Sequence, residues 1–241
     1  MIPTDPRLLR YQQLRDELAL KIARCEWRAG EAIPAQEELA STYGIAVGTV
    51  RKAVDVLVAE GILERSQGRG TFVKRPKFDG SLFRFFRFQS RSGERRIPTS
   101  RILHREVVDP PATVISILKL KERSKAIHML RLRIIEEEPL LIEDIWLPYD
   151  KFEGVMSVPT AQIGDLLYPA YEEHCNQIVG SATETLTVEL VTNADAKQLC
   201  LKPGTPIVVI ERVAFGYDQE PLEWRCSRGP ANHFHYRAEI R

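Results

Sequence analysis

The chain has 241 residues, of which 44% are hydrophobic, so it is long enough to bury the cores of two domains. Its net charge of +1 divides into 13 Lys+Arg against 10 Asp+Glu in residues 1–78 (+3) and 21 against 23 in residues 79–241 (−2), a mild asymmetry that favours contact with a polyanion such as DNA at the N-terminal end. Four scattered cysteines without a C-x-x-C pair argue against a zinc site or a disulfide framework. With no signal-peptide pattern and no apolar run near the roughly 18 residues of a membrane span, a reduced, cytoplasmic setting is expected.

The first predicted element is a helix over residues 8–25. Leu14, Leu18 and Ile22 recur four residues apart, and Tyr11 and Cys25 extend the same apolar stripe. We expect this helix to cap the core that the following segments form.

A helix-turn-helix is predicted next. Residues 35–43 form a short amphipathic helix, and Gly44 ends it because glycine tolerates a positive φ. In residues 47–57 the apolar side chains again share one stripe, which leaves the polar and small residues at the start of this second helix facing outward. Early positions of a recognition helix meet base edges and phosphates in the major groove. These positions are Gly48, Thr49, Arg51 and Lys52.

A two-stranded wing is predicted after the second helix. Residues 62–65 and 71–74 have strand character, and the glycine-rich segment 66–70 supplies the turn between them. Arg65, Arg69 and Lys74 give the hairpin positive charge. The alternative is a three-helix core with solvated basic residues, but the ordered spacing of turn glycine, small-residue helix start and Gly-Arg-Gly tip favours a winged helix-turn-helix.

Residues 8–75 resemble the DNA-binding domain of GntR-family transcriptional regulators. The matching residues are Tyr11–Leu14, Gly30–Pro34, Glu38–Ala40, Gly44–Ile45, Thr49–Ala53, Leu57, Glu60–Leu63 and Gly68–Val73. The resemblance implies that the recognition helix and the wing contact operator DNA, with the wing in the minor groove. The candidate DNA-binding residues are Gln36, Gly48, Thr49, Arg51, Lys52, Arg65, Gln67, Gly68, Arg69 and Gly70.

Two departures from the family pattern affect DNA reading. Ala46-Val47 replaces the usual Ser-Arg before the recognition helix, which removes an N-cap hydroxyl and a guanidinium suited to guanine. Pro34-Ala35-Gln36-Glu37 replaces Pro-Ser-Glu-Arg, which exchanges a cation for an anion near the phosphates. The common operator sequence of the family is therefore not transferred to this chain.

An arginine-rich stretch runs from Arg65 to Arg105. Twelve cations in it face only Asp79 and Glu94, a local charge of +10. The part beyond Lys77 has two interpretations, a track for the DNA backbone or a solubilising linker whose arginines pair with acidic groups of the second domain.

The C-terminal part is predicted to be an antiparallel sheet with helices on one side, which makes the whole chain α+β. One hairpin joins residues 127–135 and 140–148, and a second joins residues 207–215 and 221–226. Helices are expected near residues 112–120, 163–175 and 194–199.

Arg131 and Arg133 are two residues apart on a strand, so both guanidiniums project from one face. Two such forks can clamp a carboxylate or a phosphate, and Glu143 and Glu223 can bond a ligand hydroxyl or amine from the neighbouring strands. The alternative is a cross-strand Arg–Glu ladder on a solvated sheet face.

Residues 80–240 are similar to the UTRA effector-binding domain, which marks the HutC subfamily of GntR regulators and has a fold like that of chorismate lyase. The matching residues are Arg131–Arg133, Glu138–Leu140, Ile142–Glu143, Ala196, Leu199, Gly204–Pro206, Ile210–Arg212 and Glu220–Glu223. In sugar-phosphate-responsive members an Arg-x-Arg pair and a short loop hold the anion. The resemblance implies ligand contacts at Phe88, Gln89, Ser90, Arg131, Arg133, Glu143, Tyr168 and Glu223.

The family's usual ending is replaced by Gly229–Tyr236, and Leu166 stands near Tyr168 where a serine is expected. The segment Trp224–Arg228 offers an aromatic wall and two more cations, so Trp224 and Arg228 join the candidate ligand residues. These changes favour a small carboxylate or an aromatic anion over a sugar phosphate. His233 and His235 are two apart and can bind metal, but surface or core histidines are more common, so no metal site and no cofactor is predicted.

The leading hypothesis is a ligand-responsive regulator, acting as a repressor, in which a small anionic metabolite changes how a homodimer binds an inverted-repeat operator. Its expected parts are a DNA-binding domain (1–75), a basic linker (76–90) and an effector-binding and dimerisation domain (91–241). The alternatives are a constitutive DNA-binding protein with a structural dimerisation domain and a lyase-like enzyme.

Overall fold

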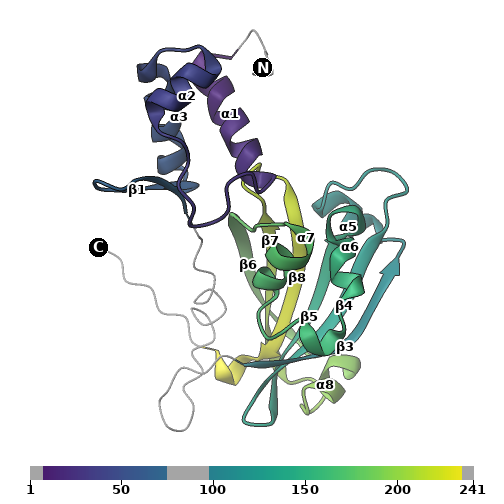
Figure 1. Cartoon of the computed structure of the whole chain (residues 1–241). Helices are drawn as coiled ribbons and strands as arrows, with labels where there is room; N and C mark the ends of the chain where they lie inside the picture. Colours follow the sequence, from purple (N-terminus) through teal and green to yellow (C-terminus); the bar gives the residue numbers. More distant parts are fainter. Residues whose placement is uncertain (1–7, 75–97, 235–241) are drawn as a thin grey trace. The chain divides into compact units, whose positions relative to one another are not determined.

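The computed structural model describes residues 8–74 and 98–234 (Figure 1). The chain divides into two compact units, and the described part of the first is residues 8–74 with the short segments 176–181 and 215–220. The second unit contains the other described residues. Among the described helices, none combines the length and hydrophobicity that crossing a membrane requires.

The first unit has three helices and a hairpin, as predicted. Helices α1 (Arg10–Ala23), α2 (Gln36–Tyr43) and α3 (Val47–Ala59) precede strands β1 (Leu63–Ser66) and β2 (Gly70–Val73). The apolar stripes of α1 and α3 meet in the core, where their side chains are fully buried. Those side chains are Leu14, Leu18 and Ile22 from α1, and Val50, Ala53, Val54 and Leu57 from α3.

The turn between α2 and α3 depends on Gly44. This residue ends α2 in the left-handed region (φ 63°), and the amide of Ile45 bonds the carbonyl of Ala40 at 3.1 Å. Helix α3 begins after Ala46, whose methyl group makes no capping hydrogen bond. The start of α3 therefore has amide groups that no N-cap side chain satisfies.

The wing is an antiparallel hairpin in which Leu63 pairs with Val73 and Ser66 with Gly70. Gly68 (φ 70°) and Gly70 (φ 114°) supply the backbone conformations of the turn. The segment before α2 pairs with the outer edge of β2, because the amide of Gly30 bonds the carbonyl of Val73 at 2.8 Å and the amide of Ile33 that of Thr71 at 2.9 Å. This pairing fixes the wing to the helical core.

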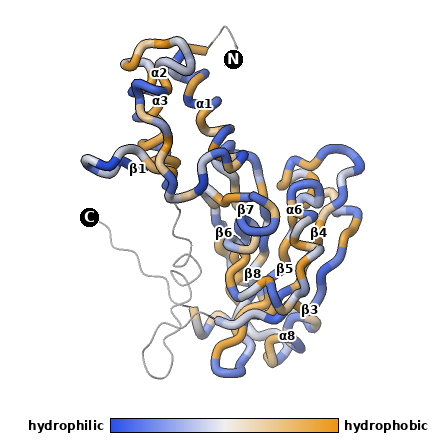
Figure 2. Tube along the Cα trace, in the orientation of Figure 1, coloured by the Kyte–Doolittle hydropathy of each residue, from blue (hydrophilic) through white to orange (hydrophobic). Residues whose placement is uncertain are grey.

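The second unit is built on a six-stranded sheet with the order β3-β4-β5-β8-β7-β6 (Figure 1). The two predicted hairpins form its centre, and Figure 2 shows that hydrophobic residues concentrate along β4 and β5 while hydrophilic ones follow the connecting loops. The sequence did not reveal β3 and β6, which are the two end strands. The six strands are β3 (Thr99–Val108), β4 (Ala126–Ile135), β5 (Glu138–Pro148), β6 (Ser181–Leu190), β7 (Pro206–Phe215) and β8 (Pro221–Pro230).

The remaining helices are α5 (Ala112–Ile117), α6 (Tyr149–Ser157), α7 (Leu167–Cys175) and α8 (Asn193–Gln198). Helices α6 and α7 pack together through Phe152 and Tyr171, whose rings meet edge-on at 4.8 Å. Tyr171 also bonds Glu223 of β8, so α7 covers the sheet face on which Glu223 lies. On the other face, Ala196 of α8 and the adjoining Leu199 pack among the apolar side chains of the sheet. The prediction that helices cover only one side of this sheet is therefore wrong.

Candidate DNA-binding surface and effector site

The four candidate residues of α3 lie opposite its buried stripe. Gly48, Arg51 and Lys52 are exposed and Thr49 is half-buried, in the first two turns of the helix. The Nε of Arg51 donates to Oε1 of Gln36 at 3.4 Å, which brings these two candidate residues together across the helix-turn-helix. The α3 start thus presents one guanidinium, a hydroxyl and uncapped amides on a single surface.

Lys52 is held by an aromatic ring of α1. Its ammonium lies 4.1 Å from the centre of the Tyr11 ring, within the range of a cation–π interaction. The contact restricts the long side chain while leaving the charge on the surface. No sequence pattern predicted this pair, because Tyr11 matched only the apolar stripe of the first helix.

The wing candidates are exposed, but its cations have different partners. Arg65 forms an ion pair with Asp55 of α3, which offsets part of its charge. Arg69 lies at the hairpin tip with its guanidinium 5.6 Å from the centre of the Phe72 ring. Gln67, Gly68 and Gly70 are exposed beside it.

Only the two ends of the arginine-rich stretch from Arg65 to Arg105 belong to the described residues. Residues 75–97 lie outside them, and so do the candidate ligand residues Phe88, Gln89 and Ser90. Arg105 belongs to the second unit, where its Nη1 donates to the carbonyl of Val155 at 2.7 Å. Burial lowers the pKa of Arg105.

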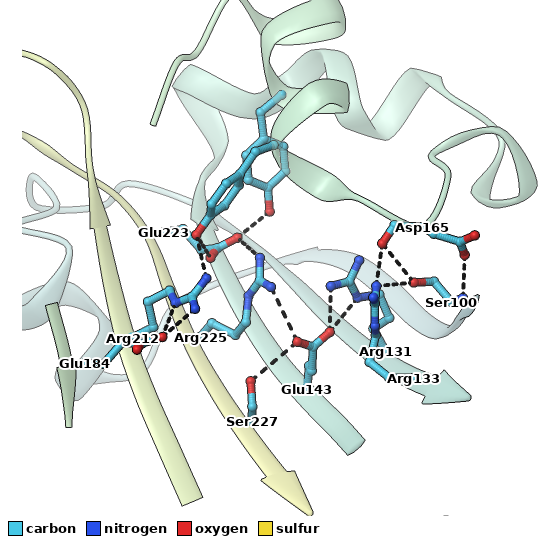
Figure 3. A network of polar contacts seen from close by, with 12 residues as sticks. Ser100, Arg131, Arg133, Glu143, Asp165, Glu184, Arg212, Glu223, Arg225 and Ser227 are labelled. Atoms are coloured by element: carbon cyan, nitrogen blue, oxygen red, sulfur yellow. Dashed lines mark hydrogen bonds and ion pairs between the residues drawn. The ribbon is translucent and has the colours of Figure 1, made fainter. Parts of the chain in front are cut away.

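The second unit contains a buried polar network, drawn in Figure 3. Its centre is the pair between Arg131 of β4 and Glu143 of β5, which lie opposite each other in the strand register. Nε and Nη2 of Arg131 donate to Oε2 of Glu143 at 2.7 and 2.6 Å. The ladder alternative therefore described the pairing correctly, but both side chains are at most 2% exposed, so the face is not solvated.

Glu143 connects Arg131 to a second arginine, Arg225 of β8. Arg225 Nη1 and the Ser227 hydroxyl each lie 3.4 Å from Oε1 of Glu143. Burial alone would raise the pKa of Glu143, but Arg131, Arg225 and Arg133 outweigh it and lower the pKa to about 2. Glu143 is thus a permanent anion among three cations.

Arg225 also joins Glu143 to Glu223. Nη2 of Arg225 donates to Oε2 of Glu223 at 2.6 Å, and the hydroxyl of Tyr171 donates to the same oxygen at 2.6 Å. Burial disfavours the charged form of Arg225, but Glu223 and Glu143 outweigh it, so the pKa of Arg225 is raised well above its ordinary value. Burial, together with Glu223, raises the pKa of Tyr171, which keeps its proton as a donor.

Tyr168 of α7 extends the network to β7 and β6. Its hydroxyl donates to Oε1 of Glu223 at 3.4 Å and accepts from Nη1 of Arg212 at 3.3 Å. Nε of Arg212 donates to Oε1 of Glu184 at 2.7 Å. The guanidinium of Arg225 lies 5.6 Å from the centre of the Tyr168 ring. Tyr168 thus lies between two arginines and one glutamate.

Arg133 differs from the other arginines of the network because neutral oxygens are its hydrogen-bond partners. Its Nη1 donates to the hydroxyl of Ser100 at 2.6 Å and to the backbone carbonyl of Asp165. Only 2% of Arg133 is exposed. Burial, reinforced by the like charge of Arg131, lowers its pKa to about 10, so the guanidinium is still charged at neutral pH.

Three guanidinium N–H groups of the network have no hydrogen-bond partner among the described residues: Arg131 Nη1, Arg133 Nε and Arg225 Nε. The buried or half-buried charges are four arginines against three glutamates, which leaves +1, and the carboxylate that faces this surplus is the exposed one of Asp165, beside Arg133. A buried cation and an unmet donor are both costly without a partner. The site therefore has the charge and the free donors to take a small anion.

Two candidate ligand residues lie on the other face of the sheet. Glu223, Arg225 and Ser227 alternate along β8 with Trp224, Cys226 and Arg228, and successive side chains of a strand point to opposite faces. Nη2 of Arg228 lies 3.8 Å from Oδ2 of Asp144, and its Nη1 lies 3.7 Å from Oδ2 of Asp195. These contacts confirm that Arg228 points away from Glu143. Trp224 and Arg228 are therefore removed from the site.

The sequence interpretation also missed members of the network. Arg225 had a usable signal, because it is two residues from Glu223 and must share its face. Arg212, Ser100 and Tyr171 had none, since β3 was not expected and the positions of β7 and α7 beside β8 depend on the tertiary structure. No group of three or more His, Cys, Asp or Glu in the described residues could hold a metal, and His235 lies outside those residues.

A winged helix-turn-helix on the same chain as a separate sheet unit with a buried anion-type site defines the class of ligand-responsive transcription regulators. Residues 10–73 match the gntR family of bacterial regulatory proteins, and residues 93–235 match the UTRA domain. The chain belongs to the GntR-type regulators that carry a UTRA domain, as the sequence predicted. The α+β fold and the function of ligand-responsive DNA-binding regulator are confirmed.

Curated relatives and a solved structure agree with this family. The chain is 28% identical over 215 residues to a protein of Escherichia coli K12 described as a probable fructoselysine utilization operon transcriptional repressor, covering 89% of this chain and 87% of the relative. It is 27% identical over 224 residues to the mannosyl-D-glycerate transport/metabolism system repressor MngR of the same strain, covering 92% and 91%. The fold matches the possible transcriptional regulator YydK of Bacillus subtilis with a TM-score of 0.56 and 19% identity, covering 97% of this chain and all of that one. The names of both curated relatives describe repressors.

Proposed function

We propose that this chain is a repressor that binds an inverted-repeat operator as a homodimer. Its affinity for the operator changes when a small anion binds the second unit. The observation that carries the proposal is the set of three N–H groups on Arg131, Arg133 and Arg225 that have no partner among the described residues, in a network whose buried and half-buried groups carry one more positive than negative charge. The proposed parts are residues 1–75 for DNA binding, 76–90 as a basic linker and 91–241 for effector binding and dimerisation.

The DNA-binding role rests on the surface around the start of α3. Arg51 is expected to meet a base edge or a phosphate with Gln36 at its side, and Thr49 and Gly48 allow close approach of the backbone. Lys52 and Arg69 supply phosphate contacts that add salt-dependent affinity. Arg65 contributes less, because Asp55 already offsets its charge.

The effector is expected to be an anion with further polar groups. A carboxylate and a phosphate both accept paired guanidinium donors. Arg133 is the arginine best suited to hold such an anion, because its hydrogen-bond acceptors are neutral oxygens and not a carboxylate. Two relatives are named for fructoselysine and for mannosyl-D-glycerate, compounds that join a sugar to a part with a carboxylate. These names support an effector that combines hydroxyl groups with an anionic group.

The test is operator binding by the purified full chain. Binding is measured by fluorescence anisotropy on DNA from upstream of its own gene. Scrambled DNA of equal length at two salt concentrations gives the non-specific baseline. A panel of sugar phosphates and sugar carboxylates is then added, and the response is the fold-change in operator affinity. We expect Arg133→Gln to keep operator affinity and to reduce the response at least tenfold.

Arg101→Gln is the matched control, because Arg101 is exposed on the neighbouring strand β3. It should respond like the unmodified chain. An equal response from Arg133→Gln would contradict the proposed anion site. Absence of any response across the panel, with specific operator binding intact, would instead support the constitutive alternative.

A further inference from the structure

One exposed carboxylate lies beside the buried network of the second unit. Asp165 belongs to the loop between the short helix η2 (Thr160–Gln162) and α7, and it is exposed. Figure 3 shows it at the Arg133 end of the network, whereas Glu184 lies at the other end. Burial lowers the pKa of Arg133, and Asp165 is one of the carboxylates that oppose this effect. The charge of Asp165 therefore acts on the site, although the residue is not part of the buried cluster.

Local contacts hold Asp165 in this position. Its Oδ1 accepts a hydrogen bond from the backbone amide of Ser100 at 2.6 Å. Its backbone carbonyl accepts from the hydroxyl of Ser100 at 3.3 Å and from Nη1 of Arg133. Among the described residues, the amide of Ser100 is the hydrogen-bond partner of this carboxylate, and no cationic side chain forms an ion pair with it. Asp165 is thus a fixed anion that can still accept a charged donor.

The charges around the site call for a ligand group of each sign. With Asp165 included, four arginines face three glutamates and one aspartate, and the sum falls from +1 to zero. The N–H groups of Arg131 Nη1 and Arg133 Nε have no acceptor among the described residues, and a buried donor without a partner is costly. A plain anion would satisfy these donors, but it would add a second negative charge beside Asp165.

This carboxylate gives the site a means of discrimination. An anion bound at Arg133 meets Asp165 as a like charge, and such repulsion is a way in which binding sites reject unwanted ligands. Because Asp165 is exposed, solvent and salt screen the repulsion and keep it moderate. An ammonium group on the same ligand changes the sign of the interaction, since it can donate a charge-assisted hydrogen bond to the carboxylate.

We propose that the effector site selects a zwitterion. Its carboxylate or phosphate binds the free guanidinium donors of Arg131 and Arg133, and its ammonium group binds the carboxylate of Asp165. Asp165 is then the residue that distinguishes this ligand from a plain anion of the same shape. The inference rests on the proposed function and names the chemical class of the effector.

The first test compares two pairs of probes on the full chain. Within each pair an ammonium group replaces one hydroxyl: glucosamine 6-phosphate with glucose 6-phosphate, and glucosaminate with gluconate. Affinity is obtained from the shift of the thermal unfolding midpoint with probe concentration. In at least one pair we expect the ammonium-bearing probe to bind about tenfold more tightly, because it gains an attraction where the hydroxyl probe gains none.

Asp165→Asn is the decisive variant. The amide oxygen of asparagine can still accept from the Ser100 amide, so the loop is expected to keep its conformation while the charge is lost. The preference within the pair should disappear. Inorganic phosphate, which has no ammonium group, should bind this variant about fivefold more tightly than the unmodified chain, because a like charge has been removed. Structural damage to the site would weaken phosphate binding instead.

Two further variants complete the comparison. Asp150→Asn is the matched control, because Asp150 is an exposed aspartate on α6, and it should behave like the unmodified chain. Arg133→Gln should weaken both members of each pair and inorganic phosphate alike, because it removes the donors that hold the anion.

The outcomes separate this inference from the proposed function. Equal binding within both pairs, or a preference that survives in Asp165→Asn with unchanged phosphate binding, overturns the zwitterion and leaves the anion-responsive regulator standing. Absence of binding by phosphate and by all four probes, with specific operator binding intact, overturns the anion site and this inference with it. Loss of the preference together with tighter phosphate binding in Asp165→Asn supports the selection of a zwitterion.

Discussion

Replacing Glu143 with glutamine should destabilise the second unit strongly, because this carboxylate neutralises part of the charge of Arg131 and Arg225. The pKa of Glu143 falls from its ordinary value of 4.5 to about 2 in the folded chain. A difference of roughly 2.5 units corresponds to about 3 kcal/mol of stability. Removing one partner of a buried ion pair typically costs about 3–5 kcal/mol, which agrees with that figure.

The pH dependence follows from the same numbers. Because the folded pKa is lower than the unfolded one, the stabilisation from Glu143 is fully present above pH 4.5 and is lost as the pH falls from 4.5 to about 2. Glu143→Gln has no carboxyl group to titrate at this position. Its stability should therefore fall less steeply than that of the unmodified chain across this window.

The assay is urea unfolding, monitored by tryptophan fluorescence. A Trp27→Phe background leaves Trp146 and Trp224 of the sheet as reporters. Protein concentration is held constant, because a dimer makes stability depend on it. Glu122→Gln, at an exposed position, is the control. A loss below about 1 kcal/mol at pH 7, with unchanged pH dependence, would refute the reasoning that the network is buried and charged.

Three further predictions concern single residues. Arg69→Ala should weaken binding to all DNA sequences alike and reduce the slope of log affinity against log salt by about 1, measured by anisotropy; an unchanged slope would remove Arg69 from the phosphate contacts. Gly48→Ala should leave or slightly raise the melting temperature, because open space surrounds a Cβ there, but should weaken operator binding if the α3 backbone approaches DNA closely. Gly154→Ala should destabilise the second unit by about 1–3 kcal/mol in urea, because its Cβ would overlap the carbonyl of His174 in α7; a neutral effect would show that α6 and α7 separate freely.

Local sequence patterns determined the first unit almost completely. The apolar stripes of α1 and α3, the left-handed Gly44 and the wing glycines all act over a few residues, so their spacing predicts the elements they form. The same holds for the hairpin of β4 and β5, where alternation and the turn brought Arg131 opposite Glu143. What these patterns did not show was the contact between Lys52 and Tyr11, which joins residues 41 positions apart.

Local sequence patterns did not predict the end strands β3 and β6. Strand β3 alternates weakly, and β6 is exposed on nearly every residue, so neither has the hydrophobic period that marks a half-buried strand. They become strands because the central hairpins offer free edges to pair with. Ser100 and Glu184 entered the polar network only through that pairing.

The sequence by itself determined the family, the order of the two units and the cationic character of the site, because these depend on residue types at short spacings. The tertiary structure decided which side chains share the site. It brought Arg225 beside Glu143, placed α7 over Glu223 and directed Trp224 and Arg228 to the opposite face. It also decided that the arginines are buried, and a buried N–H donor without a partner is costly in a way that the same group on a hydrated surface is not.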